Sequence, residues 1–162
     1  MKEFYDFIFP YLKGRILDIG CGSGRDVEFF SSLGFEIEGV EASKKFFAYC
    51  KKKYPGLKFY NETFPFFDLR RKYDVITLVA VWMHLKKSFY LKAVKNLKKH
   101  LNEKGVVVLS YSANKREGFE FVNPKRLSYL FLREGFKKID EKKFNDALKR
   151  DVVWITQIFE AI

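Results

Sequence analysis

The stretch that decides the fold is Leu17-Asp18-Ile19-Gly20-Cys21-Gly22-Ser23-Gly24-Arg25-Asp26. It begins in a short apolar run at residues 15–19, which is typical of a buried strand. Glycines follow at every second position, and glycine lets a backbone turn sharply and approach a ligand because it has no Cβ. Residues 26–33 then have the pattern of a helix that ends at Gly34. The stretch predicts a strand, a turn and a helix whose N-terminal N–H groups point at a bound ligand.

The spacing of the glycines separates the nucleotide-type ligands that such a turn can bind. A dinucleotide site needs a third glycine at position 25, which is Arg25 here, so a nicotinamide-dependent reductase is disfavoured. A Walker-type loop needs Gly-Lys followed by Ser or Thr, which the stretch lacks. Glu41 ends the next predicted strand, about 20 residues on, where a carboxylate accepts hydrogen bonds from a ribose diol.

Apolar runs alternate with amphipathic stretches along the rest of the chain, which indicates an open α/β sheet. Strands are expected at residues 15–19, 35–40, 57–60, 73–81, 106–110, 136–144 and 152–160. Helices are expected at residues 4–12, 26–33, 43–53, 88–101 and 123–135, with Ser43, Ser88 and Asn123 as N-terminal caps. The predicted fold class is α/β, Rossmann-like and doubly wound. It has a mostly parallel seven-stranded sheet, helices on both faces and a C-terminal antiparallel hairpin, in a single domain over residues 1–162.

The composition predicts a globular protein that buries a core, since 48% of the 162 residues are hydrophobic. This excludes a disordered chain, and no apolar run approaches the roughly 18 residues of a membrane span. The first residues lack the layout of a signal peptide, so we expect a cytoplasmic monomer or homodimer without a membrane partner. Cys21 and Cys50 are expected to be free thiols, and no metal site is expected.

The net charge of +11 arises from 31 basic and 20 acidic residues. A strongly basic domain can bind nucleic acid, an anionic membrane or an acidic partner. The lysines, however, come mostly singly or in scattered pairs, and only residues 51–53 form a longer run. A single glutamine beside abundant Lys and Glu is typical of a thermophile composition. We therefore interpret the charge mainly as a solvated surface.

Several motifs together resemble those of class I S-adenosylmethionine-dependent methyltransferases. They are Asp18-x-Gly20-x-Gly22-x-Gly24 with Glu41 behind it, Tyr73-Asp74-Val75-Ile76, Leu101-Asn102-Glu103-Lys104-Gly105, and Gly24-Arg25-Asp26, which resembles a subgroup of small stand-alone enzymes. The resemblance covers residues 11–160. It implies S-adenosylmethionine as the cofactor and S-adenosylhomocysteine as the product, and it leaves the methyl acceptor open because a fold does not fix a function.

The resemblance also implies roles for individual residues around the glycine turn. Glu41 would hold the ribose hydroxyls, and Asp18 would position the turn or the amine of the methionine part. Arg25 would meet the carboxylate of the cofactor. The other cofactor contacts implied in this part of the chain are Gly20, Cys21, Gly22, Gly24, Ala42 and Val79.

Two further parts of the cofactor have expected neighbours. Either Asn61 or Glu62, just after the third strand, would lie near the adenine amino group. The N-terminal helix within residues 1–14 would lie over the cofactor, where the rings of Tyr5 and Tyr11 are candidates to contact the cationic sulfonium. The alternative for both tyrosines is packing in an aromatic core.

Methyl transfer from a sulfonium requires mainly proximity and orientation, worth up to about 7–11 kcal/mol. A base is needed only where the acceptor carries a proton. His84, which follows the fourth strand, is the candidate catalytic or substrate-contacting residue. The alternative is a histidine that bonds a backbone carbonyl and shapes its loop.

The sequence favours a small-molecule acceptor and leaves two alternatives. RNA or another polyanion would draw on the positive charge, but the fourth strand ends in Val79-Ala80-Val81-Trp82 and lacks the N-P-P-Y-type motif of base methylation. A non-catalytic cofactor-binding domain is the second alternative.

Overall fold

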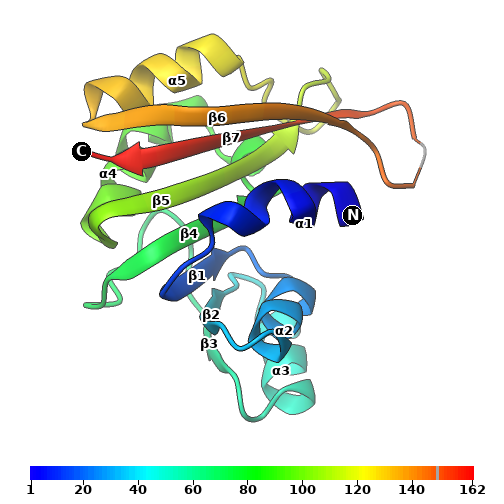
Figure 1. The fold of residues 1–162 in the computed structure, drawn as a ribbon. Helices are drawn as coiled ribbons and strands as arrows, with labels where there is room; N and C mark the ends of the chain where they lie inside the picture. The colour runs from blue at the N-terminus through cyan, green and yellow to red at the C-terminus, as the bar shows by residue number, and fades with distance from the viewer. Residues whose placement is uncertain (149) are drawn as a thin grey trace.

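The computed structural model describes residues 1–148 and 150–162. The strands are β1 (Arg15–Ile19), β2 (Glu36–Val40), β3 (Lys58–Tyr60), β4 (Tyr73–Val79), β5 (Leu101–Ser112), β6 (Phe136–Asn145) and β7 (Val153–Ala161). They form one sheet in the order β3-β2-β1-β4-β5-β7-β6 (Figure 1). The first five strands pair in parallel, whereas β7 runs antiparallel to both β5 and β6. The expected fold class and the C-terminal hairpin are therefore confirmed.

Helices cover both faces of this sheet, as expected. The α-helices are α1 (Lys2–Ile8), α2 (Arg25–Ser32), α3 (Lys44–Lys53), α4 (Tyr90–Lys99) and α5 (Pro124–Arg133), with 3-10 turns η1 (Phe9–Tyr11), η2 (Trp82–His84) and η3 (Lys87–Phe89). Because side chains alternate along a strand, Ile16 and Val75 pack with α1, α2 and α3, while Leu17 and Ile76 pack with α4 and α5. In Figure 1, α1 crosses the near face beside β4 and β5.

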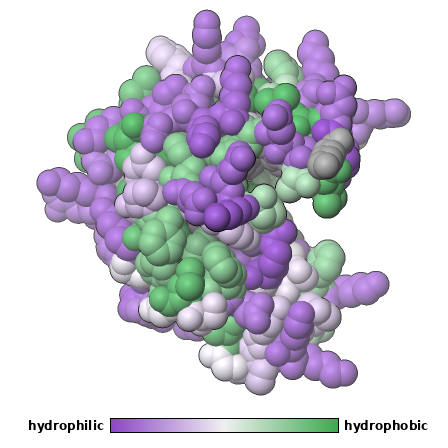
Figure 2. Space-filling model, turned by 45° about the vertical axis from the view of Figure 1, so that its right-hand side comes forward, coloured by the Kyte–Doolittle hydropathy of each residue, from purple (hydrophilic) through white to green (hydrophobic). Residues whose placement is uncertain are grey.

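Polar side chains lie mainly outside this core. Figure 2 shows a mostly hydrophilic surface with one apolar area in its lower half. None of the helices in the described residues has the length and apolarity of a membrane span, since the longest have 10 residues.

Local chemistry explains where several helices begin and end. The Ser43 hydroxyl accepts a hydrogen bond from Phe46 N at 3.3 Å, and the Asn123 side chain accepts one from Arg126 N at 3.0 Å. Both predicted caps are therefore confirmed. Gly34 follows α2 with a φ of +91°, a left-handed conformation that glycine adopts without strain.

Several expected boundaries were wrong. The N-terminal helix, expected at residues 4–12, is α-helical only over Lys2–Ile8, because the chain continues from Phe9 as a 3-10 turn that contains Pro10. Ser88 makes no cap, because it lies in η3 and α4 begins after Phe89 without a side-chain cap. β5 begins at Leu101 instead of residue 106, because the β4–β5 register shifts there and Lys104 takes a φ of +55°. β4 ends at Val79 instead of Val81, because Ala80 adopts a φ of +60° and turns the chain.

The order of the strands creates a switch point. The chain goes from β1 to β2 and β3 on one side, then returns to β4 on the other side of β1. The connections that leave β1 and β4 therefore diverge over opposite halves of the sheet. Open α/β sheets bind ligands in the crevice outside the carboxyl ends of the strands at such a point. Here this edge carries the glycine turn after β1, Glu41 after β2 and Ala80 after β4.

Candidate functional site

The glycine turn has a backbone that other residues would strain. Gly20, Gly22 and Gly24 have φ values of +71°, +55° and +78°. The turn is tied to β2, because Gly20 N and Cys21 N both donate to Val40 O, at 2.8 and 3.1 Å. A Cβ on Gly20 would lie 2.4 Å from Val81 Cγ2, whereas a Cβ on Gly22 would meet no atom within 4 Å. Gly20 is therefore needed for packing, and Gly22 leaves open space for a ligand.

The Glu41 carboxylate joins this turn to the start of α3. Its Oε2 accepts a hydrogen bond from Gly22 N at 2.8 Å, and its Oε1 accepts one from Ser43 N at 2.8 Å. A carboxylate has about four lone-pair positions, so each oxygen retains room for another donor. The side chain is thus held by the backbone in a fixed orientation at the edge of a cavity.

The first cavity, of about 510 Å³, extends from the glycine turn along the ends of β2 and β4. Six of the residues expected at the site lie on its wall: Gly20, Gly22, Glu41, Ala42, Glu62 and His84. Its apolar wall includes Phe46 and Phe64, which the sequence analysis did not single out. A cavity with apolar walls and a few fixed polar groups is the usual form of a small-molecule site.

The second cavity, of about 230 Å³, continues from the first past Gly20, Gly22 and Ala80. Asp18, Cys21, Arg25 and Val79, all expected at the site, lie on its wall. Gly24 does not. It precedes α2 as its N-terminal cap residue, and a Cβ there would lie 3.0–3.3 Å from Tyr54, Cys50 and Phe59. Gly24 therefore packs the turn against α3 and β3 and does not face the cavity.

Asp18 is a buried carboxyl group at the end of β1. Thr77 donates a hydrogen bond from its hydroxyl to Asp18 Oδ1 at 2.7 Å. Burial, with a smaller contribution from the Asp26 carboxylate, raises the pKa of Asp18 to about 7. Asp26 itself accepts hydrogen bonds from Tyr5 Oη at 2.6 Å and Arg25 Nε at 2.7 Å. A buried carboxyl with a raised pKa beside a cavity is typical of a functional site.

Two of the expected cofactor contacts are engaged elsewhere. The Asn61 amide donates to Glu41 O and Ala42 O, at 2.8 and 3.1 Å, so it fixes the end of β2 and leaves Glu62 as the residue on the cavity wall. The Tyr11 hydroxyl donates to Asp140 on β6, and Tyr11 lies on none of the cavities at this edge. Tyr5, bonded to Asp26 and stacked on Phe29 at 4.7 Å, is close to the second cavity but packed.

His84 lies in η2, exposed on the wall of the first cavity. Its ring lies 5.0 Å from the ring of Phe119, centroid to centroid. Its backbone N–H donates to Val81 O at 2.9 Å, which closes the turn. The ring is therefore available to a ligand while the backbone shapes the loop.

Sequence reasoning missed a third cavity, of about 370 Å³, which adjoins the second at Arg25, Val79 and Ala80. Its wall contains Phe4 of α1, Ser110 of β5, and Asp146 and Trp154 from the C-terminal hairpin. Two sequence signals lay nearby. One was Arg150-Asp151-x-x-Trp154, which resembles a pattern of the small stand-alone subgroup, and the other was the spacing of Asp146, Arg150 and Trp154, four residues apart. The structure brings these side chains together: Asp146 accepts from Arg150 Nη2 at 2.8 Å and Trp154 Nε1 at 2.9 Å.

Comparison with known proteins identifies the family of this fold and site. The family model for a methyltransferase domain matches residues 1–150, so the chain belongs to the methyltransferase-domain family. An uncharacterized methyltransferase from Alkaliphilus oremlandii is 26% identical over 110 residues, which are 68% of this chain and 51% of that protein. The chain thus spans about half of that relative.

Solved structures share the fold. A TehB-like SAM-dependent methyltransferase from Corynebacterium glutamicum superposes with a TM-score of 0.80 at 18% identity, over 97% of this chain and 86% of the other. SAM-bound CalS10, an amino pentose methyltransferase from Micromonospora echinaspora, has a TM-score of 0.74 at 18% identity, over 96% and 89% of the two chains. These likenesses establish the common architecture.

Proposed function

We propose that this protein binds S-adenosylmethionine along the first and second cavities and transfers its methyl group to a small-molecule acceptor. The observation that carries the proposal is the Glu41 carboxylate, held by Gly22 N and Ser43 N at the edge of the first cavity. A fixed carboxylate beside an open glycine turn is the arrangement that accepts a ribose diol. Membership of the methyltransferase-domain family supports the same assignment.

The residues fit the parts of the cofactor in order along the sheet edge. The adenosine would occupy the first cavity, with its base between Phe46, Ala42 and Glu62. The amino-acid part would occupy the second cavity, where the Arg25 guanidinium suits a carboxylate and the Asp18 carboxyl suits an ammonium. A nearby cation favours the ionised form of Asp18, so binding would lower its raised pKa.

When bound, the cofactor supplies a methyl group on a sulfonium that needs no further activation. The protein contributes orientation: the glycine turn and Glu41 fix one side, and Ala80 leaves the passage between the cavities open. We propose that His84 contacts the bound ligand in the first cavity, where its ring is exposed. Replacing His84 with Gln would then weaken binding of S-adenosylhomocysteine without changing the free energy of unfolding, whereas a purely loop-shaping histidine would lower stability and binding together.

The charges at this edge favour a small acceptor over RNA. Carboxyl groups outnumber guanidinium groups on the walls of the first two cavities, with Asp18, Asp26, Glu41 and Glu62 against Arg25. The longest lysine run, at residues 51–53, lies in the last turn of α3, away from these walls. A polyanion would need a basic surface around the cavity mouth. CalS10, an amino pentose methyltransferase with the same fold, acts on a small molecule and supports this choice.

Calorimetric titration with S-adenosylmethionine, S-adenosylhomocysteine and NADH tests the proposal. We expect both sulfur ligands to bind and NADH not to bind. Replacing Glu41 with Gln should weaken binding about 100-fold, because charge-assisted hydrogen bonds are worth about 1.5–3 kcal/mol each. Absence of binding by either sulfur ligand at millimolar concentration would overturn the proposal, and binding without any turnover would favour the non-catalytic alternative.

A matched pair of glycine variants separates binding from folding. Gly22 and Gly34 both have positive φ, at +55° and +91°, and a Cβ on either meets nothing within 4 Å. Gly22→Ala and Gly34→Ala should therefore cost a similar free energy of unfolding, about 1 kcal/mol. Only Gly22→Ala should weaken S-adenosylhomocysteine binding, by about tenfold or more, because its methyl group would stand at the ligand surface. Equal affinities of the two variants would contradict the assigned role of the turn.

A further inference from the structure

The third cavity adjoins the second at Arg25, Val79 and Ala80, on the side of the C-terminal hairpin. We propose that this cavity holds the methyl acceptor, and that the acceptor is a small, flat, apolar molecule whose reacting group is an anion, a thiolate or a phenolate. The inference rests on the proposed function, because it takes the second cavity as the place of the methyl donor. Its own evidence is the chemistry of the walls.

The aromatic side chains on the walls of the third cavity favour an acceptor that is mostly apolar. Phe4 is only 9% exposed, and its ring packs edge-on against Phe144 at 6.1 Å, which fixes it in place. Trp154 is half-buried, and its ring is fixed by the hydrogen bond from Nε1 to Asp146 at 2.9 Å. Rigid aromatic walls favour a flat ligand. At about 370 Å³, the cavity is near the lower limit of small-molecule sites, which suits a body of one or two rings.

Two guanidinium groups give the cavity its polar character. Arg25 directs Nε and Nη2 to Asp26, and Arg150 directs Nε and Nη2 to Asp146. Within the described residues, neither Nη1 has a hydrogen-bond partner, so Arg25 Nη1 is left for the cofactor carboxylate and Arg150 Nη1 for the acceptor. Each guanidinium is paired with a carboxylate and more than half exposed, at 59% for Arg25 and 53% for Arg150. An anionic acceptor therefore gains the N–H groups of Arg150 Nη1 as hydrogen-bond donors, which an ammonium cannot use because it has no acceptor atom.

The cavity wall offers no carboxylate base among the described residues. Its carboxylate, Asp146, accepts hydrogen bonds on Oδ1 from Arg150 and Trp154, and on Oδ2 from Arg150 and Leu148 N. The Arg150 guanidinium, followed by the Trp154 N–H, holds the pKa of Asp146 well below its usual range. His84 lies on the first cavity, not on this one. An acceptor that has already lost its proton needs no base.

Methyl transfer to such an anion conserves atoms, electrons and charge. The acceptor thiol or phenol gives its proton to water before reaction, and hydrogen bonds from Arg150 Nη1 favour the resulting anion. A lone pair of the anion forms the new bond to the methyl carbon. The bond from that carbon to the sulfonium sulfur breaks, and its electron pair stays on sulfur. The products are a methyl thioether or methyl ether and S-adenosylhomocysteine, with no charge left on either reacting atom.

The first test uses the wild-type protein and three small ligands. Thiophenol and 4-nitrophenol are ionised at mildly alkaline pH, and benzylamine of similar size is a cation. We expect S-adenosylhomocysteine to form from S-adenosylmethionine at least about tenfold faster with either anion than with benzylamine. We also expect 4-nitrophenol to bind the protein–S-adenosylhomocysteine complex in calorimetry, with benzylamine binding at least about tenfold more weakly. Preference for benzylamine in both assays would overturn the inference.

Variants localise the effect to this cavity. Arg150→Met should weaken 4-nitrophenol binding about tenfold, Arg150→Lys should restore part of it, and Arg133→Met on the exposed end of α5 is the matched control. Arg150→Met removes the charged partner of the buried Asp146 and can lower stability, so Leu148 provides a second test. It is 74% exposed on the same wall, so Leu148→Glu should fold and should weaken anion binding relative to Leu148→Gln. Equal affinities in that pair would overturn the assignment.

Binding of S-adenosylhomocysteine is measured in every sample. Its loss in the wild-type protein would refute the proposed function. Its retention together with unselective acceptor binding would refute the acceptor inference alone.

Discussion

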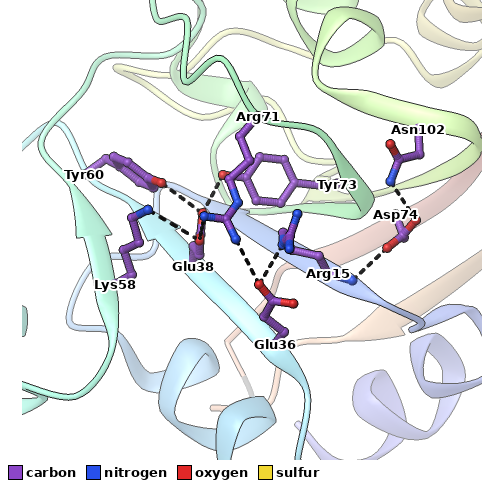
Figure 3. Close-up of polar contacts among 9 residues, drawn as sticks. All are labelled: Arg15, Glu36, Glu38, Lys58, Tyr60, Arg71, Tyr73, Asp74 and Asn102. Atoms are coloured by element: carbon purple, nitrogen blue, oxygen red, sulfur yellow. Dashed lines mark hydrogen bonds and ion pairs between the residues drawn. The ribbon is translucent and has the colours of Figure 1, made fainter.

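The two ends of the parallel strands use the same residue types in opposite ways. At the amino ends, Glu36, Glu38 and Asp74 are all engaged by partners from neighbouring strands (Figure 3). At the carboxyl ends, Asp18 and Glu41 stand on cavity walls with acceptor positions left open. The comparison shows that a carboxylate is a candidate for ligand binding when its neighbours leave some of its acceptor positions free.

Glu38 is the clearest example of a carboxylate whose two oxygens are both engaged by neighbouring side chains. It is 4% exposed, and its Oε2 accepts hydrogen bonds from Tyr73 Oη at 2.6 Å and Tyr60 Oη at 3.1 Å. Its Oε1 pairs with Arg71 Nη1 at 3.2 Å, and Lys58 Nζ lies 3.8 Å away. Figure 3 shows these side chains converging on Glu38 from β3, β4 and the segment before β4. Both oxygens of Glu38 are engaged by these partners, so the side chain holds the strands together.

The largest effect on stability is expected from opening that network. Glu38→Gln would remove the buried one of the two carboxylates that pair with Arg71, leaving only the exposed Glu36, and would remove one charged oxygen from a group that two tyrosines share. Breaking a buried pair by removing one partner is strongly destabilising, so we expect a loss of about 3 kcal/mol in the free energy of unfolding. Urea denaturation followed by circular dichroism measures it. A loss below about 1 kcal/mol would show that the contacts of Glu38 stabilise the fold no more than exposed ion pairs do.

An effect of similar size that depends on pH is expected at the carboxyl ends of the strands. The pKa of Asp18 is about 7 in the folded protein, above its ordinary value, so the folded state binds a proton more tightly than the unfolded state. The contribution of Asp18 to the free energy of unfolding is therefore fully present below about pH 4 and falls by on the order of 2–4 kcal/mol toward pH 7. Asp18→Asn should remove this part of the pH dependence. Denaturation at both pH values tests it, and an unchanged slope in the variant would assign the dependence to other groups.

The smallest effect is expected two residues from Glu38 on the same strand. Glu36 pairs with Arg15 Nε at 2.7 Å and Arg71 Nη2 at 3.0 Å, but its side chain is 57% exposed. Exposed ion pairs contribute little, because water and salt screen them. Glu36→Gln should therefore unfold at the same urea concentration as the wild type. A loss as large as that of Glu38→Gln would mean that shared pairing with Arg71, not burial, controls the energetics.

Much of the fold was predictable because its signals are local. The alternation of apolar runs with helical patterns, the caps Ser43 and Asn123, and Gly34 after α2 each depend on a few neighbouring residues. The failures were long-range. Ser88 has the chemistry of a cap, yet packing starts α4 two residues later, and the early start of β5 depends on pairing between Tyr73 and Leu101.

The candidate site divides in the same way. Gly20, Gly22 and Glu41 were identifiable because their spacing reports a turn and a strand end. Asn61 and Glu62 remained indistinguishable, because only the folded chain shows which one bonds the end of β2. The Asp146 cluster could not be predicted, because an aspartate in a loop is normally exposed to solvent. Only the folded chain shows that Arg150 and Trp154 surround it.

Ala80 connects these observations, because it lies on the walls of all three cavities. Its φ of +60° and its N–H bond to Ser110 O at 2.9 Å hold it in the turn after β4. The ends of the parallel strands form the first two cavities on one side of Ala80, and the C-terminal hairpin forms much of the third cavity on the other side. Substitutions in the hairpin connection can therefore reshape the third cavity while the glycine turn stays unchanged, provided that the side chain at position 80 stays small.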